Sequence, residues 1–185
     1  MTQSQMSQSP VALRDTRPPA ALTANVVSMP SSFTSYRIRY SLIRWLVDER
    51  CTHALTLNVN RDITFPKLSK MFGEFCLEVD RLRNAKKRVA VLPASDRVFA
   101  VAFPEHMTTN PHLHLAMRLD GWWRGPVDAG AEKKLWRAWR RITSGAGSMR
   151  LDVMDDPFGW GQYVTKDFAA TGGQYLLSHD YHHGR

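Results

Sequence analysis

NPHLHLAM, residues 110–117, places two histidines two positions apart in a segment that otherwise alternates like a β-strand. A strand sends successive side chains to opposite faces, so His112 and His114 are predicted to point the same way. Arg118 shares their face, and four apolar side chains fill the other: Leu113, Leu115, Met117 and Leu119. Neutral imidazole is the commonest nitrogen ligand for divalent metals in proteins. The pair therefore predicts a metal site, although two solvent-facing histidines on a hairpin strand give the same pattern.

A second segment, residues 53–60, alternates in the same way, with one apolar face and one polar face. Further strands are predicted at 89–92, 98–103 and 149–153, and helices at 36–50, 66–88, 128–142 and 158–169. Strands with one polar face suit a sheet that is covered on one side only. We therefore expect an α+β fold, a ferredoxin-like antiparallel sheet with helices packed on one face and an open face that carries the site.

Composition divides the chain into three parts. Residues 1–33 are rich in Ser, Gln, Thr, Ala and Pro with few charges, and they are predicted to form a disordered tail. Residues 34–170 carry the periodic segments and are expected to form one domain. Residues 171–185, which hold His179, His182 and His183, are predicted to be a flexible C-terminal tail.

The chain is strongly basic, with a formal net charge of +8 at pH 7 and a sequence pI near 9.9. This balance predicts a polyanionic partner, for which nucleic acid and an anionic membrane surface both qualify. No segment has the unbroken apolar length of a membrane span, and the first thirty residues lack the pattern of a secretory signal. Cys51 and Cys76 lack CxxC spacing, which argues against a disulfide framework and a cysteine zinc site. We expect a cytoplasmic protein with no membrane partner.

A second chemical signal lies shortly after the last predicted strand. Asp156 followed by Pro157 has the pattern of a helix N-cap with proline at the first helical position. In the helix that follows, Tyr163 and Lys166 are three residues apart and are therefore neighbours. They are predicted to lie beside a buried stripe formed by Trp160, Val164 and Phe168.

The histidine strand and this helix together resemble the HUH endonuclease superfamily, and most closely its rolling-circle replication initiators. Members carry a short strand motif, a His-hydrophobe-His strand and a Tyr-x-x-Lys helix, in that order. The matching segments are 54–58, 112–114 and 163–166. The resemblance covers residues 52–168 and implies sequence-specific, metal-dependent nicking of single-stranded DNA. It also implies a 5′-phosphotyrosyl link at Tyr163 and a free 3′-hydroxyl, made to initiate replication of a plasmid or phage.

The chemistry suits the residues independently of the family. A tyrosine hydroxyl can form a phosphodiester intermediate, but near neutral pH a free phenol is almost wholly protonated. Mg²⁺ or Mn²⁺ on His112 and His114, with Glu105 as third ligand, would polarise the scissile phosphate. Lys166 could stabilise negative charge on the phosphate or phenolate. His106 or Asp120 could take the place of Glu105 as the acidic or third ligand.

The expected partners follow from this hypothesis. Single-stranded or cruciform DNA is the expected substrate, contacted by Thr56, Asn58, Asn60, Arg118, Arg137 and Arg140. The sequence contains no GxxxxGK[ST] loop, so a host helicase is expected to open the strands and a polymerase to extend the 3′ end. The catalytic helix holds one tyrosine, so a second cleavage needs another cycle or a second subunit, as in a homodimer.

Three alternatives remain open at the level of sequence. The first is a binding module that holds single-stranded DNA or RNA with basic helices and Trp122, Trp123 or Trp136, without cleavage. The second is a relaxase or transposase of the same superfamily, since these processes share the chemistry. The third is a metal-dependent hydrolase that uses the same ligands with water as nucleophile.

Overall fold

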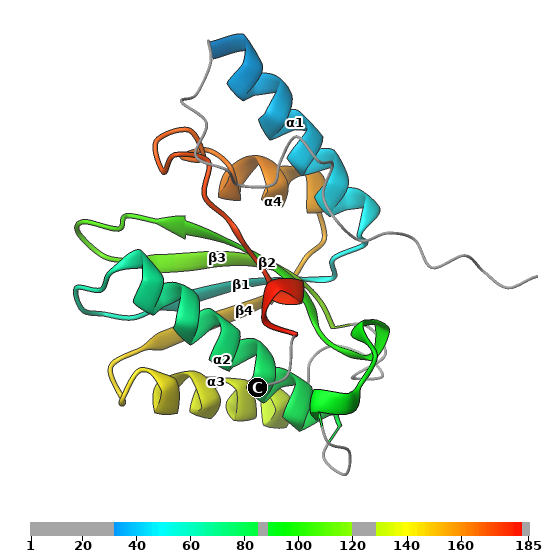
Figure 1. Cartoon of the computed structure of the whole chain (residues 1–185), viewed down its shortest axis with the longest axis vertical. Helices are drawn as coiled ribbons and strands as arrows, with labels where there is room; N and C mark the ends of the chain where they lie inside the picture. Colours follow the sequence, from blue (N-terminus) through cyan, green and yellow to red (C-terminus); the bar gives the residue numbers. More distant parts are fainter. Residues whose placement is uncertain (1–31, 85–88, 120–128, 183–185) are drawn as a thin grey trace, which may run out of the picture.

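A five-stranded sheet lies between two layers of helices (Figure 1). The computed structural model describes residues 32–84, 89–119 and 129–182. In spatial order the strands are β4 (Ser148–Val153), β1 (His53–Asn58), β3 (His112–Arg118), β2 (Phe99–Glu105) and β5 (Leu176–Leu177). Every pairing in this sheet is antiparallel, which confirms the predicted α+β class. No helix within the described ranges combines the length and apolarity that a membrane span requires.

The register of β3 decides which residues share a face of the sheet. His114 lies opposite Thr56 of β1 and Phe103 of β2, and His112 lies opposite Asn58 and Glu105. Alternate residues of β3 point the other way, and they are buried in one core: Leu113, Leu115 and Met117. The predicted division of this strand into a histidine face and an apolar face is therefore confirmed.

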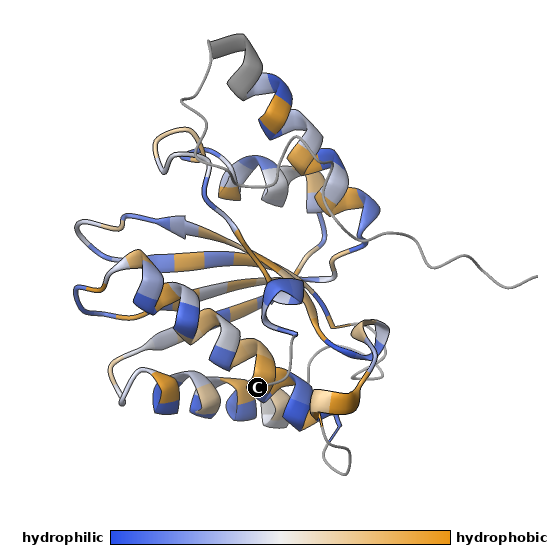
Figure 2. Cartoon of the chain, viewed as in Figure 1, coloured by the Kyte–Doolittle hydropathy of each residue, from blue (hydrophilic) through white to orange (hydrophobic). Residues whose placement is uncertain are grey.

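Two helices, α2 (Phe65–Arg83) and α3 (Ala129–Ile142), cover the apolar face of the sheet (Figure 1). Their largest core side chains, Phe72, Phe75 and Trp139, are fully buried among strand residues that include Leu55 and Leu57. Burying a side chain of this size contributes roughly 1.5–3 kcal/mol, so this layer supplies much of the driving force for folding. Figure 2 shows the pattern that makes it possible, with apolar and hydrophilic residues alternating along strands and helices.

The other two helices, α1 (Ser32–Asp48) and α4 (Pro157–Val164), lie across part of the opposite face (Figure 1). We expected the helices on one face only, and this second layer differs from that expectation. Its reason is a second apolar core, in which Leu42 and Trp45 of α1 are buried together with Val101 and Ala116 of the sheet. The site face is therefore part apolar and covered, and part polar toward the end of β3 that carries the histidines.

Three local predictions were wrong. The helix predicted at 158–169 ends at Val164, and residues 165–173 form turns. Residues 89–92 do not form a strand, because Val89–Val91 is a short 3-10 helix. Residues 176–181 of the predicted flexible C-terminal tail are held in the fold, because β5 pairs with β2 and Ser178–Tyr181 forms a 3-10 helix that packs against α2. Residues 183–185 of that tail lie outside the described residues. The Ser178 hydroxyl accepts a hydrogen bond from the Ala100 N–H (3.0 Å) and donates one to the Val98 carbonyl (2.9 Å). These bonds satisfy one backbone group of β2 and one of the residue that precedes it, both of which would otherwise lie at an open sheet edge. The predicted N-terminal tail lies mostly outside the described residues.

Candidate metal centre and nucleophile

The antiparallel register brings a carboxylate and two imidazoles together on the site face. Glu105 pairs with His112 across β2 and β3, and His114 lies two residues further along β3 on the same face. Glu105 Oε2 is 3.0 Å from His112 Nε2 and 2.9 Å from His114 Nε2, and the two nitrogens are 3.2 Å apart. One nitrogen from each histidine and one carboxylate oxygen thus converge, as the ligands of a single metal ion do. Pro104 lies within β2 and does not prevent Glu105 from reaching the histidines.

The far nitrogen of each imidazole is also held. His112 Nδ1 lies 2.8 Å from the Asn110 carbonyl oxygen, which can only accept, so this nitrogen carries the proton and Nε2 is directed at the cluster. His114 Nδ1 lies 3.0 Å from the Thr56 hydroxyl. Outer contacts of this kind orient metal-binding histidines. Three groups rich in lone pairs that face one another require a proton or a cation among them, and the donor set suits a divalent ion.

Burial and charge set the protonation states of the cluster. Burial raises the pKa of Glu105. A hydrogen bond from Lys166, one from His112 when its Nε2 is also protonated, and the charge of protonated His114 outweigh burial and lower this pKa to about 2. Burial lowers the pKa of His114. The charge of Glu105 and its hydrogen bond oppose this, His112 and Lys166 add to it, and the net direction is downward. The hydrogen bond to Glu105 raises the pKa of Lys166. At neutral pH the centre therefore contains a carboxylate, an ammonium group and a neutral His114 with a lone pair to offer.

Tyr163 lies directly against this cluster. Its ring centroid is 5.1 Å from that of His114, and the residue is 44% exposed, so it is open to solvent as well as in contact with the cluster. α4 ends at Val164, and the turn that follows brings the Lys166 ammonium within 2.8 Å of Glu105 Oε1 and 4.0 Å of the Tyr163 ring centroid. The structure thus brings Tyr163, Lys166, Glu105, His112 and His114 together from three separate segments.

α4 is anchored at both ends. The Asp156 carboxylate accepts a hydrogen bond from the Gly159 N–H (2.9 Å), so the predicted N-cap is confirmed. A Cβ on Gly159 would lie 2.2 Å from Asp156 Oδ2, so glycine permits this cap. At the other end Arg39 of α1 donates to Thr165 Oγ1 and to the Gln162 carbonyl oxygen. These contacts fix the helix that carries Tyr163.

The predicted DNA contacts are dispersed. The Thr56 hydroxyl contacts His114, one of the metal ligands. Where β1 ends, the Asn60 N–H donates a hydrogen bond to the Asn58 side chain. Arg118 lies at the far end of β3, where its guanidinium stacks over Phe99 and pairs with Glu49.

Arg137 and Arg140 are on α3, which packs on the other face of the sheet. Arg140 donates to the Gly145 carbonyl oxygen and lies over Trp136. Neither arginine shares a surface with the metal cluster. Trp122 and Trp123 lie outside the described residues.

The structure places one of the two alternative third ligands, His106, and does not describe the other, Asp120. His106 stacks on the ring of His112, with centroids 5.4 Å apart, and forms a second potential metal-binding group with Glu105 and Asp167. Asp120 lies outside the described residues. Because Glu105 contacts both histidines directly, it is the best-placed acidic ligand among the residues that the structure describes.

Trp160 belongs to the site, although its spacing predicted only a buried stripe. Its ring stacks on Tyr163 (centroids 5.3 Å apart, 26° between planes) and meets the edge of His114. Its indole N–H donates to the Leu115 carbonyl oxygen (3.1 Å). The three-residue spacing from Tyr163 was the available signal. Asn110 and Asp167 were also missed, and they carried no signal in the sequence.

No protein-family model, curated protein or solved structure that we compared matches this chain. We therefore infer its function from the chemistry of the residues that the fold brings together and from the motif resemblance described above.

Proposed function

We propose that this protein is a metal-dependent endonuclease that nicks single-stranded DNA at a specific sequence and becomes joined to the new 5′ end through Tyr163. The observation that carries the proposal is the cluster of Glu105, His112 and His114 beside an exposed tyrosine and a lysine. Initiation of rolling-circle replication of a plasmid or phage is the process we assign to this chemistry. It uses the free 3′ end that such a nick leaves.

The reaction exchanges one phosphodiester bond for another. The Tyr163 oxygen attacks phosphorus, the bond from phosphorus to the 3′ oxygen breaks, and the phenolic proton is balanced by a proton on the released 3′-hydroxyl. Glu105, His112 and His114 would hold a Mg²⁺ or Mn²⁺ ion, which would supply Lewis acidity toward a phosphate oxygen. Lys166 carries a positive charge next to Tyr163 and stabilises the negative charge that develops there.

Charge and topology support the same substrate class. The net charge of +8 favours a polyanion. Tyr163 is half-exposed on a short helix at the surface of the sheet, so a DNA strand can lie across it. A nucleophile in a closed pocket would instead admit only a small molecule. Strand opening is assigned to a partner helicase.

The decisive experiment is capture of the covalent intermediate. The protein is incubated with Mn²⁺ or Mg²⁺ and a labelled library of single-stranded oligonucleotides, and an SDS-resistant adduct is sought. Tyr163→Phe should abolish the adduct, whereas Tyr40→Phe should retain it. Tyr40 is a matched control because it is 45% exposed on α1, against 44% for Tyr163. An adduct that persists in Tyr163→Phe would refute the assignment of the nucleophile.

One observation favours a second candidate, a non-catalytic module that binds single strands. α3 exposes cations around Trp136, which is 38% exposed and lies under the Arg140 guanidinium. Interleaved cations and aromatic rings are typical of surfaces that hold single-stranded nucleic acid. Salt-sensitive binding without an adduct would favour this candidate, and cleavage without an adduct would favour water as the nucleophile.

A further inference from the structure

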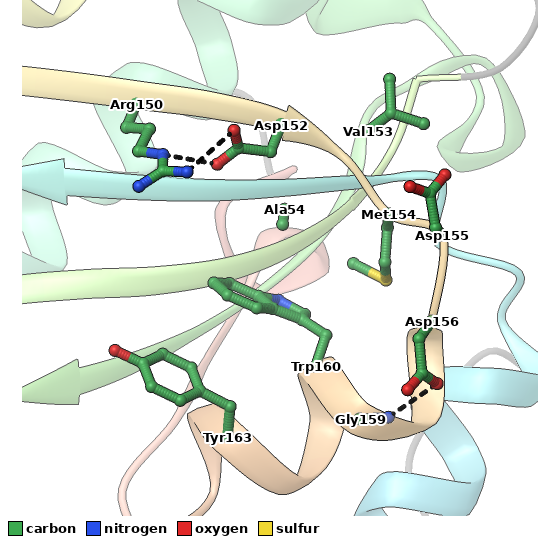
Figure 3. A pocket seen from close by; sticks show the side chains of 10 residues that line it. All are labelled: Ala54, Arg150, Asp152, Val153, Met154, Asp155, Asp156, Gly159, Trp160 and Tyr163. Carbon is green, nitrogen blue, oxygen red and sulfur yellow. Dashed lines mark hydrogen bonds and ion pairs between the residues drawn. The ribbon is translucent and has the colours of Figure 1, made fainter.

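A groove beside Tyr163 extends over the site face toward the edge strand β4 (Figure 3). Its volume is about 510 Å³. Ala54 of β1 and Asp152 of β4, which pair across the sheet, line one side of it, and Trp160 and Tyr163 of α4 line another. Ala54 is two residues from Thr56, the partner of His114. The groove therefore begins immediately beside the metal cluster.

The charges in this groove disfavour phosphate. Three carboxylates line it, from Asp152, Asp155 and Asp156, against the single cation of Arg150. Arg150 is already paired with Asp152, with 2.8 Å between Nε and Oδ2. A phosphate is repelled here and attracted instead to Lys166, whose ammonium group lies over the Tyr163 ring and does not line the groove. An uncharged part of a nucleotide, its base, is not repelled in this way.

An aromatic surface is ready for such a base. The Trp160 ring is fixed by its hydrogen bond to the Leu115 carbonyl and by stacking on Tyr163, and Figure 3 shows both rings on the same side of α4. Ala54, which is buried, lines the groove beside them. Stacking of an unpaired base on an aromatic side chain is a common mode of single-strand binding.

Asp155 adds a means of selecting which base the groove accepts. Asp152 is paired with Arg150 and Asp156 caps α4, whereas Asp155 is exposed and makes no hydrogen bond or ion pair with the described residues. An ionised carboxylate only accepts hydrogen bonds. Cytosine, adenine and guanine each present an exocyclic amino donor, and thymine presents none.

We propose that this groove holds one unpaired, amino-bearing base of the DNA strand, next to the phosphate that Tyr163 attacks. The base lies against Trp160 and donates a hydrogen bond from its amino group to Asp155. This inference rests on the proposed nicking function and adds to it a residue that determines base specificity.

The test uses an oligonucleotide that the protein cleaves, with thymine placed in turn at each nucleotide that flanks the cleaved bond. At one of the two positions thymine should lower kcat/KM by at least about 5-fold, the lower limit for loss of one good base contact. Asp155→Asn should reduce this difference below about 2-fold, because its amide can donate to a thymine carbonyl. Glu132→Gln, the same loss of charge on α3 across the sheet, should retain the full difference.

A binding measurement separates the two proposals. Tyr163→Phe cannot form the adduct. The difference between the affinities of this variant for matched cytosine- and thymine-substituted oligonucleotides therefore reports on the groove without the covalent step. Equal affinities, or a preference that Asp155→Asn leaves unchanged, would overturn the groove assignment even if the wild-type protein nicks DNA. A preference that depends on Asp155, in a protein that never forms an adduct, would retain the groove and reject the nickase.

Discussion

At the scale of single residues, Glu105 is the centre on which the site depends. One oxygen contacts both imidazoles and the other pairs with Lys166, so one carboxylate connects the metal ligands to the side chain beside Tyr163. Its pKa of about 2 lies well below the ordinary 4.5. Folding therefore favours the ionised form, and the stability of the metal-free protein must depend on pH.

The sign of this dependence follows from the direction of the shift. Between pH 4.5 and about 2 the unfolded chain takes up a proton at Glu105 that the folded protein does not, so stability falls as the pH falls through this window. The full difference corresponds to a loss on the order of 3 kcal/mol. The lowered pKa of His114 adds a loss in the same direction that begins nearer pH 6.5. Urea unfolding across this range should show a weaker pH dependence for Glu105→Gln than for the wild type, and parallel curves would contradict the assignment.

Metal binding should be separable from the nucleophile. A ligand that binds only the folded state at 100 times its Kd raises the free energy of unfolding by about 2.7 kcal/mol. We expect Mn²⁺ to stabilise the wild type and Tyr163→Phe to this extent, and to stabilise His114→Ala little, since that variant lacks one of three ligands. Thermal unfolding with and without Mn²⁺ measures the effect. Full stabilisation of His114→Ala would place the metal elsewhere.

Thr56 tests whether the outer contact of His114 matters. Loss of an outer partner typically lowers metal affinity 10–100-fold, so Thr56→Val should weaken Mn²⁺ binding by about that factor. Thr52→Val is the matched control, because Thr52 contacts His53 (2.9 Å between Oγ1 and Nδ1), which is not part of the cluster. Calorimetric titration of both variants gives the comparison. Equal affinities would mean that the backbone alone orients His114.

At the scale of elements, α4 is a short helix whose position depends on its cap. Replacing an N-cap Asp with Ala costs about 1 kcal/mol, so Asp156→Ala should lower the free energy of unfolding by that amount. Asp155→Ala, one residue earlier, removes a side chain with no hydrogen bond or ion pair among the described residues and should change it by less than about 0.5 kcal/mol. Urea unfolding of the two variants makes the comparison. Equal losses would show that the cap does not hold α4.

The elements also show what the sequence could predict. β1 and β3 were predictable because strict alternation of apolar and polar residues indicates a strand with one buried face. The pair Leu176–Leu177 is too short to show a period, and it forms a strand only because β2 offers an unpaired edge. Val89–Val91 illustrates the converse, since a short apolar run does not by itself distinguish a strand from a helical turn.

The site also has a part that the sequence predicts and a part that it does not. His112, His114, Tyr163 and Lys166 were predictable from residue type and order. The contact of Lys166 with Glu105 depends on the turn that ends α4, and the groove depends on β4 pairing with β1. Neither leaves a local pattern in the sequence.

At the scale of the whole molecule, the basic helix α3 and the helix α4 lie on opposite faces of the sheet (Figure 1). The metal cluster is on the α4 side, because His114 contacts Tyr163. A short oligonucleotide bound at Tyr163 cannot also contact Arg137 and Arg140, whereas a longer strand can pass around the sheet edge at β4. We therefore expect the double variant Arg137→Gln/Arg140→Gln to cleave a short oligonucleotide normally. Its binding to long single-stranded DNA should weaken, with the slope of log affinity against log salt reduced by roughly 1.4, or about 0.7 for each lost phosphate contact. Anisotropy titrations over a range of salt, with cleavage assays on the short substrate, measure both quantities. If the double variant keeps its thermal stability but cleaves the short substrate more slowly, α3 belongs to the site. If its salt slope is unchanged, the cations of α3 contact no DNA.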